Sequence, residues 1–242
     1  GKTYVAETLA RLLTGDEEER MEVVQFHPSY AYEDFVEGIR PKVTEDAAGL
    51  RYEVRAGVFL DLVERAKERA DAPFFIVIDE MNRANLPRVL GELLYALEFR
   101  GKAHPFRLPY SGRETYIPEN ITVIGTMNSA DRSIALVDAA IRRRFRHVDF
   151  DPDPVVLRRW LEGNGLGDMA ELATTRLTAL NEKLLDLLDR DRLIGHTYLM
   201  RPDLREAGLE AVWVEDVEPV LREHLYGQPE EIEALRAVFL GA

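Results

Sequence analysis

PFFIVIDE, residues 73–80, is the stretch that decides the fold. An unbroken apolar run, residues 74–78, leads directly into two carboxylates, Asp79 and Glu80. A strand buried on both faces of a parallel sheet requires such a run, because neither of its faces meets water. We therefore predict a central strand here, with both acidic side chains at its carboxyl end.

Segments on either side of this strand repeat the pattern. Further short strands are predicted at 22–27, 121–128 and 146–150. Apolar residues at helical spacing predict helices at 4–13, 56–70, 86–99 and 134–145. Strands alternating with helices imply parallel order with both sheet faces covered, so the predicted fold class is α/β.

Two polar stretches interrupt the alternation. Residues 42–55 are predicted to form an exposed insertion, and a hairpin that turns near Ala48 and Gly49 would fit it. Residues 101–120 are rich in proline and suit a surface hairpin better than a core element.

The character of the chain changes at DPDP, residues 151–154. Strand-like runs end there, and a helical stripe of leucines follows at 177, 180, 184, 187 and 188. Further helices are predicted near 212–226 and 230–240. We predict an α/β domain at 1–151 and a small helical domain at 152–242, with the two prolines at the hinge.

Composition limits the class of protein. The chain has 242 residues, 46% of them hydrophobic, and a net charge of -13. It contains no cysteine, which excludes a disulfide framework and thiolate metal sites. No apolar stretch is long enough to span a bilayer, so we expect a soluble, cytoplasmic protein. The acidic balance argues against strong attraction of this segment to a nucleic-acid backbone.

The first three residues, Gly1, Lys2 and Thr3, precede a predicted helix. A phosphate-binding loop, G-x-x-x-x-G-K-[ST], ends in this way. The rest of that loop and the strand before it would lie upstream, so we expect a fragment of a longer protein. An ordinary helix start is the alternative.

Together with Asp79 and Glu80, these residues supply the parts of a nucleoside-triphosphate hydrolase. Lys2 would reach the phosphates, and Thr3 would bind Mg²⁺. Asp79 would hold that metal directly or through water, and Glu80 would accept a proton from the attacking water. Alternatively, the acidic pair only marks a strand returning to solvent.

GTMNSADRS, residues 125–133, lies at the end of another predicted strand. Asn128 would orient the attacking water there. Asp131 and Arg132 would support Glu80 or couple the site to a neighbouring subunit. Asp131 and Ser133 would also serve as helix caps, and both roles are compatible.

Three arginines, Arg142, Arg143 and Arg144, end the next predicted helix. An arginine inserted into a neighbouring subunit's site would stabilise the transition state. We assign this role to Arg143 or Arg144 and a structural role to Arg142. Compensation of the helix dipole accounts for one or two of them.

Four stretches together resemble the McrB family, the AAA+ motor subunits of modification-dependent restriction systems. They are QFHPSYAYEDFVEGIRP, IDEMNRANLPRVLGELL, GTMNSADRSIALVDAAIRRRF and RLIGHTYL. The resemblance implies an AAA+ P-loop core that lacks its first strand and most of its phosphate loop, followed by a helical lid. It also places Arg192 or His196 near the nucleotide.

The same resemblance implies hexameric rings that hydrolyse GTP rather than ATP, and a McrC-like nuclease partner. Hydrolysis would power DNA translocation and cleavage, and a domain upstream of this segment would recognise DNA. An ATP-dependent, MoxR-like remodelling chaperone is the first alternative. A ring scaffold that does not hydrolyse nucleotide is the second.

Overall fold

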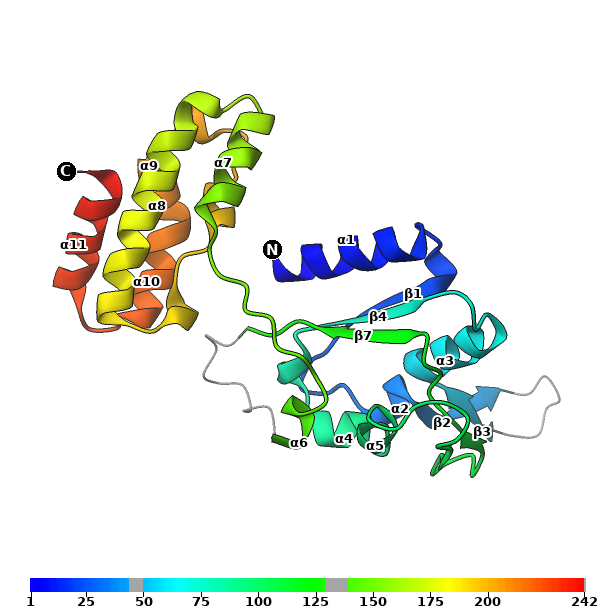
Figure 1. The fold of residues 1–242 in the computed structure, drawn as a ribbon. Helices are drawn as coiled ribbons and strands as arrows, with labels where there is room; N and C mark the ends of the chain where they lie inside the picture. The colour runs from blue at the N-terminus through cyan, green and yellow to red at the C-terminus, as the bar shows by residue number, and fades with distance from the viewer. Residues whose placement is uncertain (44–49, 129–138, 242) are drawn as a thin grey trace. The chain divides into compact units, whose positions relative to one another are not determined.

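A computed structural model describes residues 1–43, 50–128 and 139–241 (Figure 1). The chain divides into two compact units, Gly1–Val148 and Asp149–Ala242. The first is an α/β unit and the second is helical, and each is described by itself below.

The sheet of the first unit has the strand order β1 (Met21–Gln25), β4 (Phe74–Asp79) and β7 (Ile121–Gly125). Both pairings are parallel, with Gln25 opposite Asp79 and Ile78 opposite Gly125. The predicted central strand, its two neighbours and the α/β class are therefore confirmed.

Helices cover both faces of β4 (Figure 1). Phe75 and Val77 pack against Ala6 and Ala10 of α1 (Lys2–Thr14). The alternate residues, Phe74, Ile76 and Ile78, join the main core with α3 (Val58–Glu68) on the other face. Because successive side chains of a strand point to opposite faces, a continuous apolar run serves both layers.

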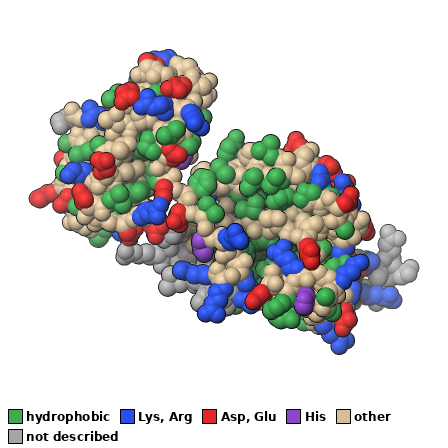
Figure 2. Space-filling model, viewed as in Figure 1, with side chains coloured by type: hydrophobic (Ala, Val, Ile, Leu, Met, Phe, Trp, Pro, Cys, Tyr) green, Lys and Arg blue, Asp and Glu red, His purple; other side chains and the backbone are tan. Residues whose placement is uncertain are grey.

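The predicted first helix is present, but its large apolar side chains are not the ones that meet the sheet. Ala6 and Ala10 are buried, whereas Leu12 is 74% exposed and Leu9 and Leu13 are also exposed. The small residues face the sheet and allow α1 to lie close to it. Figure 2 shows apolar side chains gathered over this helix.

The predicted strand at 146–150 is wrong. The structure has no strand there, and Val148 is 80% exposed. An alternating apolar pattern forms a strand only beside a partner, and this segment pairs with none of the described strands.

The helix predicted at 86–99 is interrupted. It consists of α4 (Leu86–Leu90) and α5 (Leu93–Ala96), which are separated at Gly91 with φ 49° and ψ -127°. This conformation is readily adopted only by glycine. The preceding turn, η2 (Met81–Arg83), joins β4 to α4, and Asn85 caps α4 by accepting the Arg88 N–H at 3.1 Å.

Both polar insertions are antiparallel hairpins. The first pairs β2 (Glu37–Val43) with β3 (Leu50–Ala56) and begins before the predicted insertion, while its predicted turn lies outside the described residues. α2 (Tyr32–Phe35) precedes it. The second pairs β5 (Phe106–Arg107) with β6 (Glu114–Thr115), as predicted, although Leu108 and Ile117 are buried.

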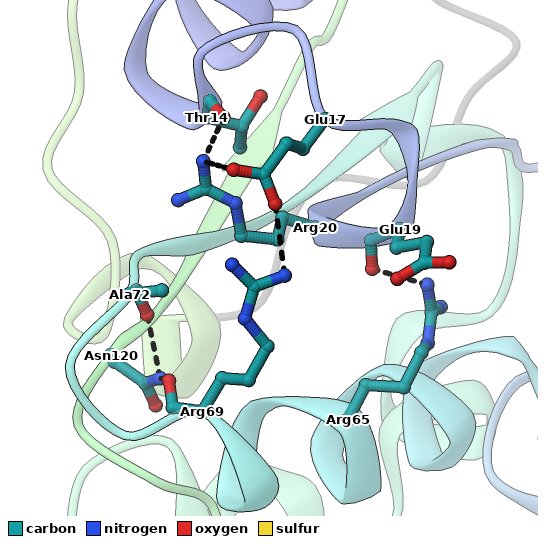
Figure 3. A network of polar contacts seen from close by, with 8 residues as sticks. All are labelled: Thr14, Glu17, Glu19, Arg20, Arg65, Arg69, Ala72 and Asn120. Atoms are coloured by element: carbon teal, nitrogen blue, oxygen red, sulfur yellow. Dashed lines mark hydrogen bonds and ion pairs between the residues drawn. The ribbon is translucent and has the colours of Figure 1, made fainter.

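Hydrogen bonds lock the end of the sheet where the parallel strands begin (Figure 3). Asn120, just before β7, donates from Nδ2 to the Ala72 carbonyl, just before β4, at 2.8 Å. Close by, the Glu17 carboxylate accepts from Arg20 at 2.7 Å and from Arg69 at 2.9 Å. Arg20 is the last residue of η1 (Glu18–Arg20). This network lies at the opposite end of the strands from Asp79.

The second unit consists of helices around a leucine-rich core. They are α7 (Pro154–Gly163), α8 (Gly167–Leu187), η3 (Arg190–Arg192), η4 (His196–Leu199), α9 (Leu204–Val212), the π-helix η5 (Trp213–Val217), α10 (Glu218–His224) and α11 (Pro229–Leu240). Leu177, Leu180 and Leu184 of the predicted stripe are buried, whereas Leu187 is exposed. Among the residues described, no helix has the length and apolar character needed to cross a membrane.

Candidate active site

The start of α1 lies against the carboxyl end of β4. The Thr3 hydroxyl donates a hydrogen bond to Asp79 Oδ1, at 2.6 Å, although 76 residues separate them. Lys2, the preceding residue, is exposed. The structure thus brings the predicted end of a phosphate loop together with the predicted metal-binding carboxylate.

Thr126, the residue after β7, contacts both Asp79, the last residue of β4, and Glu80, which follows it. Its hydroxyl also donates to Asp79 Oδ1, at 2.6 Å, and it accepts the backbone N–H of Glu80 at 3.3 Å. The side chain is only 8% exposed. Sequence reasoning gave Thr126 no role, because its contacts join the ends of two strands that are far apart in the sequence.

Glu80 has a left-handed backbone, with φ 51° and ψ 42°. Few residues other than glycine adopt this region, and those that do are often found at functional sites. Thr126 holds the turn by two hydrogen bonds: its hydroxyl accepts the Glu80 N–H, and its carbonyl accepts the Met81 N–H at 2.9 Å. The Glu80 carboxylate pairs with Arg83 Nε at 3.1 Å.

Asn128 lies beside this turn. Asn82 donates from Nδ2 to the Asn128 carbonyl at 3.2 Å, which connects the residues after β4 to those after β7. The Asn128 side chain is exposed, whereas Asn82 is buried and its Oδ1 has no hydrogen-bond partner among the described residues. Asp131 and Arg132, the other predicted residues of this loop, lie outside the described part of the chain.

The three arginines after β7 have different surroundings. Arg144 donates from Nε to the Leu94 carbonyl and forms an ion pair with Glu98 at 2.9 Å. Arg142 ends α6 (Ala139–Arg142) and is exposed. Arg143 is exposed and forms no hydrogen bond or ion pair with the residues that the structure describes. Arg143 and Arg144 are the two arginines predicted to act in a neighbouring subunit's site. Of these, Arg144 is held within its own chain, and Arg143 is exposed to solvent.

His196 belongs to the second unit. Its Nδ1 accepts the backbone N–H of Asp153 at 2.9 Å, so this nitrogen carries no proton in that contact. Burial lowers the pKa of His196, which favours the neutral ring. Arg192 lies nearby in sequence and pairs with Asp189 at 3.7 Å.

The oxygen donors of Thr3 and Asp79 fit Mg²⁺, which prefers such ligands and takes the remainder from phosphates and water. Among the described residues, no group of three or more His, Cys, Asp or Glu side chains could hold a metal ion by itself. A metal at this site would therefore depend on a bound nucleotide for part of its ligand shell.

Two models of known protein families match parts of this chain. The family model "AAA domain (dynein-related subfamily)" matches residues 1–145, and the chain therefore belongs to the AAA domain family. The model "McrB, alpha-helical lid domain" matches residues 172–233 in the second unit.

Two similar proteins indicate the family more closely. The type IV methyl-directed restriction enzyme EcoKMcrB subunit of Escherichia coli K12 is 36% identical over 95% of this chain. With the lid match, this similarity identifies the chain as a McrB-family AAA+ protein. The type II restriction enzyme BsuMI component YdiS of Bacillus subtilis is 22% identical over 84% of this chain and 71% of its own length. The chain spans about half, 52%, of the length of the Escherichia coli relative.

Proposed function

We propose that this chain is the nucleotide-hydrolysing part of an AAA+ motor in a restriction system, and that it uses Mg²⁺ and GTP. The observation that carries the proposal is the hydrogen bond from Thr3 to Asp79, with Glu80 and the Asn128 loop at the same edge of the sheet. The match to the AAA domain model supports nucleotide hydrolysis. The preference for GTP over ATP depends on the similarity to the McrB subunit alone.

The residues at the start of α1 would bind the triphosphate and its metal. Gly1 and Lys2 would contact phosphate oxygens, where the lysine ammonium offsets their negative charge. Thr3 and Asp79 would hold Mg²⁺, which when bound neutralises charge on the transferred phosphoryl group. His196 of the lid would contact the nucleotide.

Glu80 would act as the base. It would accept a proton from the water whose oxygen attacks the terminal phosphorus, as the bond to the leaving diphosphate breaks. The Asn128 amide would orient that water, and Asp131 and Arg132 would support this edge of the site. Arg83, which pairs with Glu80, would hold the carboxylate in its unloaded position.

Arg143 would complete the site of a neighbouring protomer. Its guanidinium is exposed and unpaired among the described residues, as a group that acts in another subunit needs to be. Arg144, tied to Leu94 and Glu98, would fix the segment that presents it.

The similarity to two relatives supports a role in restriction, because both are described as parts of restriction enzymes. We propose a homo-oligomeric ring, hexameric as in the family that the sequence resembles, in the cytoplasm. A McrC-like nuclease subunit would bind the ring, and GTP hydrolysis would move DNA.

The test compares wild-type full-length protein with Glu80→Gln, in the presence of the partner subunit and with GTP and ATP measured side by side. We expect wild-type turnover of GTP, and loss of turnover in the variant with nucleotide binding and assembly retained. Glu114→Gln, an exposed residue of β6, is the matched control and should keep wild-type activity.

Three results would change the proposal. Faster turnover of ATP than of GTP would favour a MoxR-like remodelling chaperone. No phosphate release by the wild-type protein would favour a ring scaffold. Wild-type turnover in Glu80→Gln would remove Glu80 from the mechanism.

A further inference from the structure

Asp79 and Glu80, at the end of β4, both contact the side chain of Thr126, the residue that follows β7. Thr126 Oγ1 is a donor to Asp79 Oδ1 and an acceptor for Glu80 N. A hydroxyl group performs both roles at once because it carries one proton and two lone pairs. A single oxygen atom is thus in contact with both the carboxylate assigned to the metal and the residue assigned as the base.

We propose that Thr126 is a positioning residue, which orients the Asp79 carboxylate toward the metal and holds the Glu80 backbone in its left-handed conformation. This assignment rests on the proposed function, because it gives Thr126 a role only if Asp79 and Glu80 act on a metal-bound triphosphate.

Two hydroxyls hold the Asp79 carboxylate by the same oxygen atom. Thr3 and Thr126 donate to the same atom, Oδ1, and Oδ2 accepts no hydrogen bond from the described residues. The Thr3 oxygen would bind a metal through a lone pair while its proton stays directed at Oδ1. Thr126 is the second donor to Oδ1, and it supports the carboxylate from the side of β7, so that Oδ2 is left to face the metal or its water.

The backbone of Glu80 gives an independent reason for the assignment. A left-handed conformation is unfavourable for a residue with a Cβ, and it persists only where surrounding contacts hold it. Thr126 supplies two of those holding contacts, through its hydroxyl to Glu80 N and through its carbonyl to Met81 N. The hydroxyl contact is the one that a side-chain substitution can remove.

Thr126→Val tests the role, since valine keeps the shape and loses the hydroxyl. In the full-length protein with its partner, we expect kcat to fall roughly ten- to a hundredfold, as for loss of a hydrogen bond to a charged group. Thr126→Ser should restore kcat to within about threefold of wild type. Thr115→Val, at a buried threonine that accepts from Lys67 at 2.5 Å, is the matched control and should keep wild-type kcat.

A binding measurement separates positioning from folding. Affinity for a non-hydrolysable GTP analogue in EDTA should match wild type in Thr126→Val, whereas the gain in affinity on adding Mg²⁺ should shrink. Thermal unfolding checks the fold, and Thr126→Ala provides a second variant without the hydroxyl.

Each remaining outcome overturns the assignment. Wild-type kcat in Thr126→Val, or equal impairment of the valine and serine variants, would show that the hydroxyl has no positioning role. If neither hydroxyl-free variant folds, Thr126 is a folding residue instead. If wild-type protein releases no phosphate while it binds Mg²⁺ and nucleotide, the proposed function itself fails.

Discussion

Gly57 joins β3 to α3 in a space that admits no side chain. A Cβ there would lie 2.5 Å from the Asp34 carbonyl oxygen and 2.5 Å from the Phe35 carbonyl carbon. Both obstacles are backbone atoms, which cannot rotate away as the end of a long side chain can. The Gly57 N–H donates to the Val36 carbonyl at 2.7 Å, so the close approach is also a hydrogen-bonded one.

Gly57→Ala should therefore lower the free energy of unfolding by about 1–3 kcal/mol, the usual cost of forcing an extra carbon into a packed site. Denaturation in urea, followed by circular dichroism, measures it. Gly163→Ala is the matched control, since nothing lies within 4 Å of its Cβ, and alanine should be neutral or slightly stabilising in that helix. Equal effects of the two substitutions would contradict this account.

At the residue scale, the sequence predicts those site residues that belong to a local motif. Thr3, Asp79 and Glu80 follow a recognisable motif or end an apolar run, so each is found without knowing its neighbours. Thr126 and Asn82 are not found in this way. Their contacts cross from one strand end to the other, and they become visible only once the register places Ile78 beside Gly125.

At the scale of elements, periodicity predicts that a segment is helical better than it predicts which of its side chains pack against the sheet. The pattern of α1 indicates a helix correctly, but the sheet contacts Ala6 and Ala10 rather than the leucines. The break between α4 and α5 depends on the backbone conformation of Gly91 alone. The predicted strand at 146–150 does not form because it pairs with none of the described strands. These features are set by tertiary contacts, which a local pattern does not contain.

Asn120 is a test of how the elements are joined. Its amide donates to the carbonyls of Ala66, Arg69 and Ala72, at 3.1, 3.0 and 2.8 Å (Figure 3 shows the last of these). Asn120→Ala should lower the free energy of unfolding by roughly 2–3 kcal/mol, because it leaves partly buried carbonyls without a donor. Asn120→Asp should cost at least as much, since a carboxylate offers only acceptors.

Calorimetry or urea denaturation measures these changes. Asn164→Ala is the control, because Asn164 donates to the Trp160 carbonyl at 2.8 Å from an exposed position and should cost well under about 1 kcal/mol. An Asn120→Ala protein as stable as wild type would show that the amide does not hold the α3 end to the sheet.

At the scale of the whole molecule, the proposed ring makes each site depend on two protomers. Glu80 and Arg143 would then act in the same site while belonging to different chains. Glu80→Gln and Arg143→Ala proteins should each be inactive alone. In an equal mixture, about a quarter of the interfaces would pair an intact Glu80 with an intact Arg143, and turnover should return accordingly.

The control for this experiment is Arg146→Ala, at an exposed arginine close in sequence, which should remain active alone. Exchange of fluorescently labelled protomers verifies that mixed rings form. Mixed rings that stay inactive would show that the two residues act within one chain. An active Arg143→Ala protein would show that Arg143 is not the arginine that acts in the neighbouring site.

Arg144 ties the arginine segment to Leu94 and Glu98, and the stretch that runs from Asp79 to Glu98 is short and well packed. In the proposed ring, one packed segment would therefore hold both a protomer's own acidic residues and the arginine that acts in its neighbour. In such a ring, a shift of Glu80 out of its left-handed turn would reach the adjoining subunit through these packed residues, so that neighbouring sites would hydrolyse nucleotide in a coupled order.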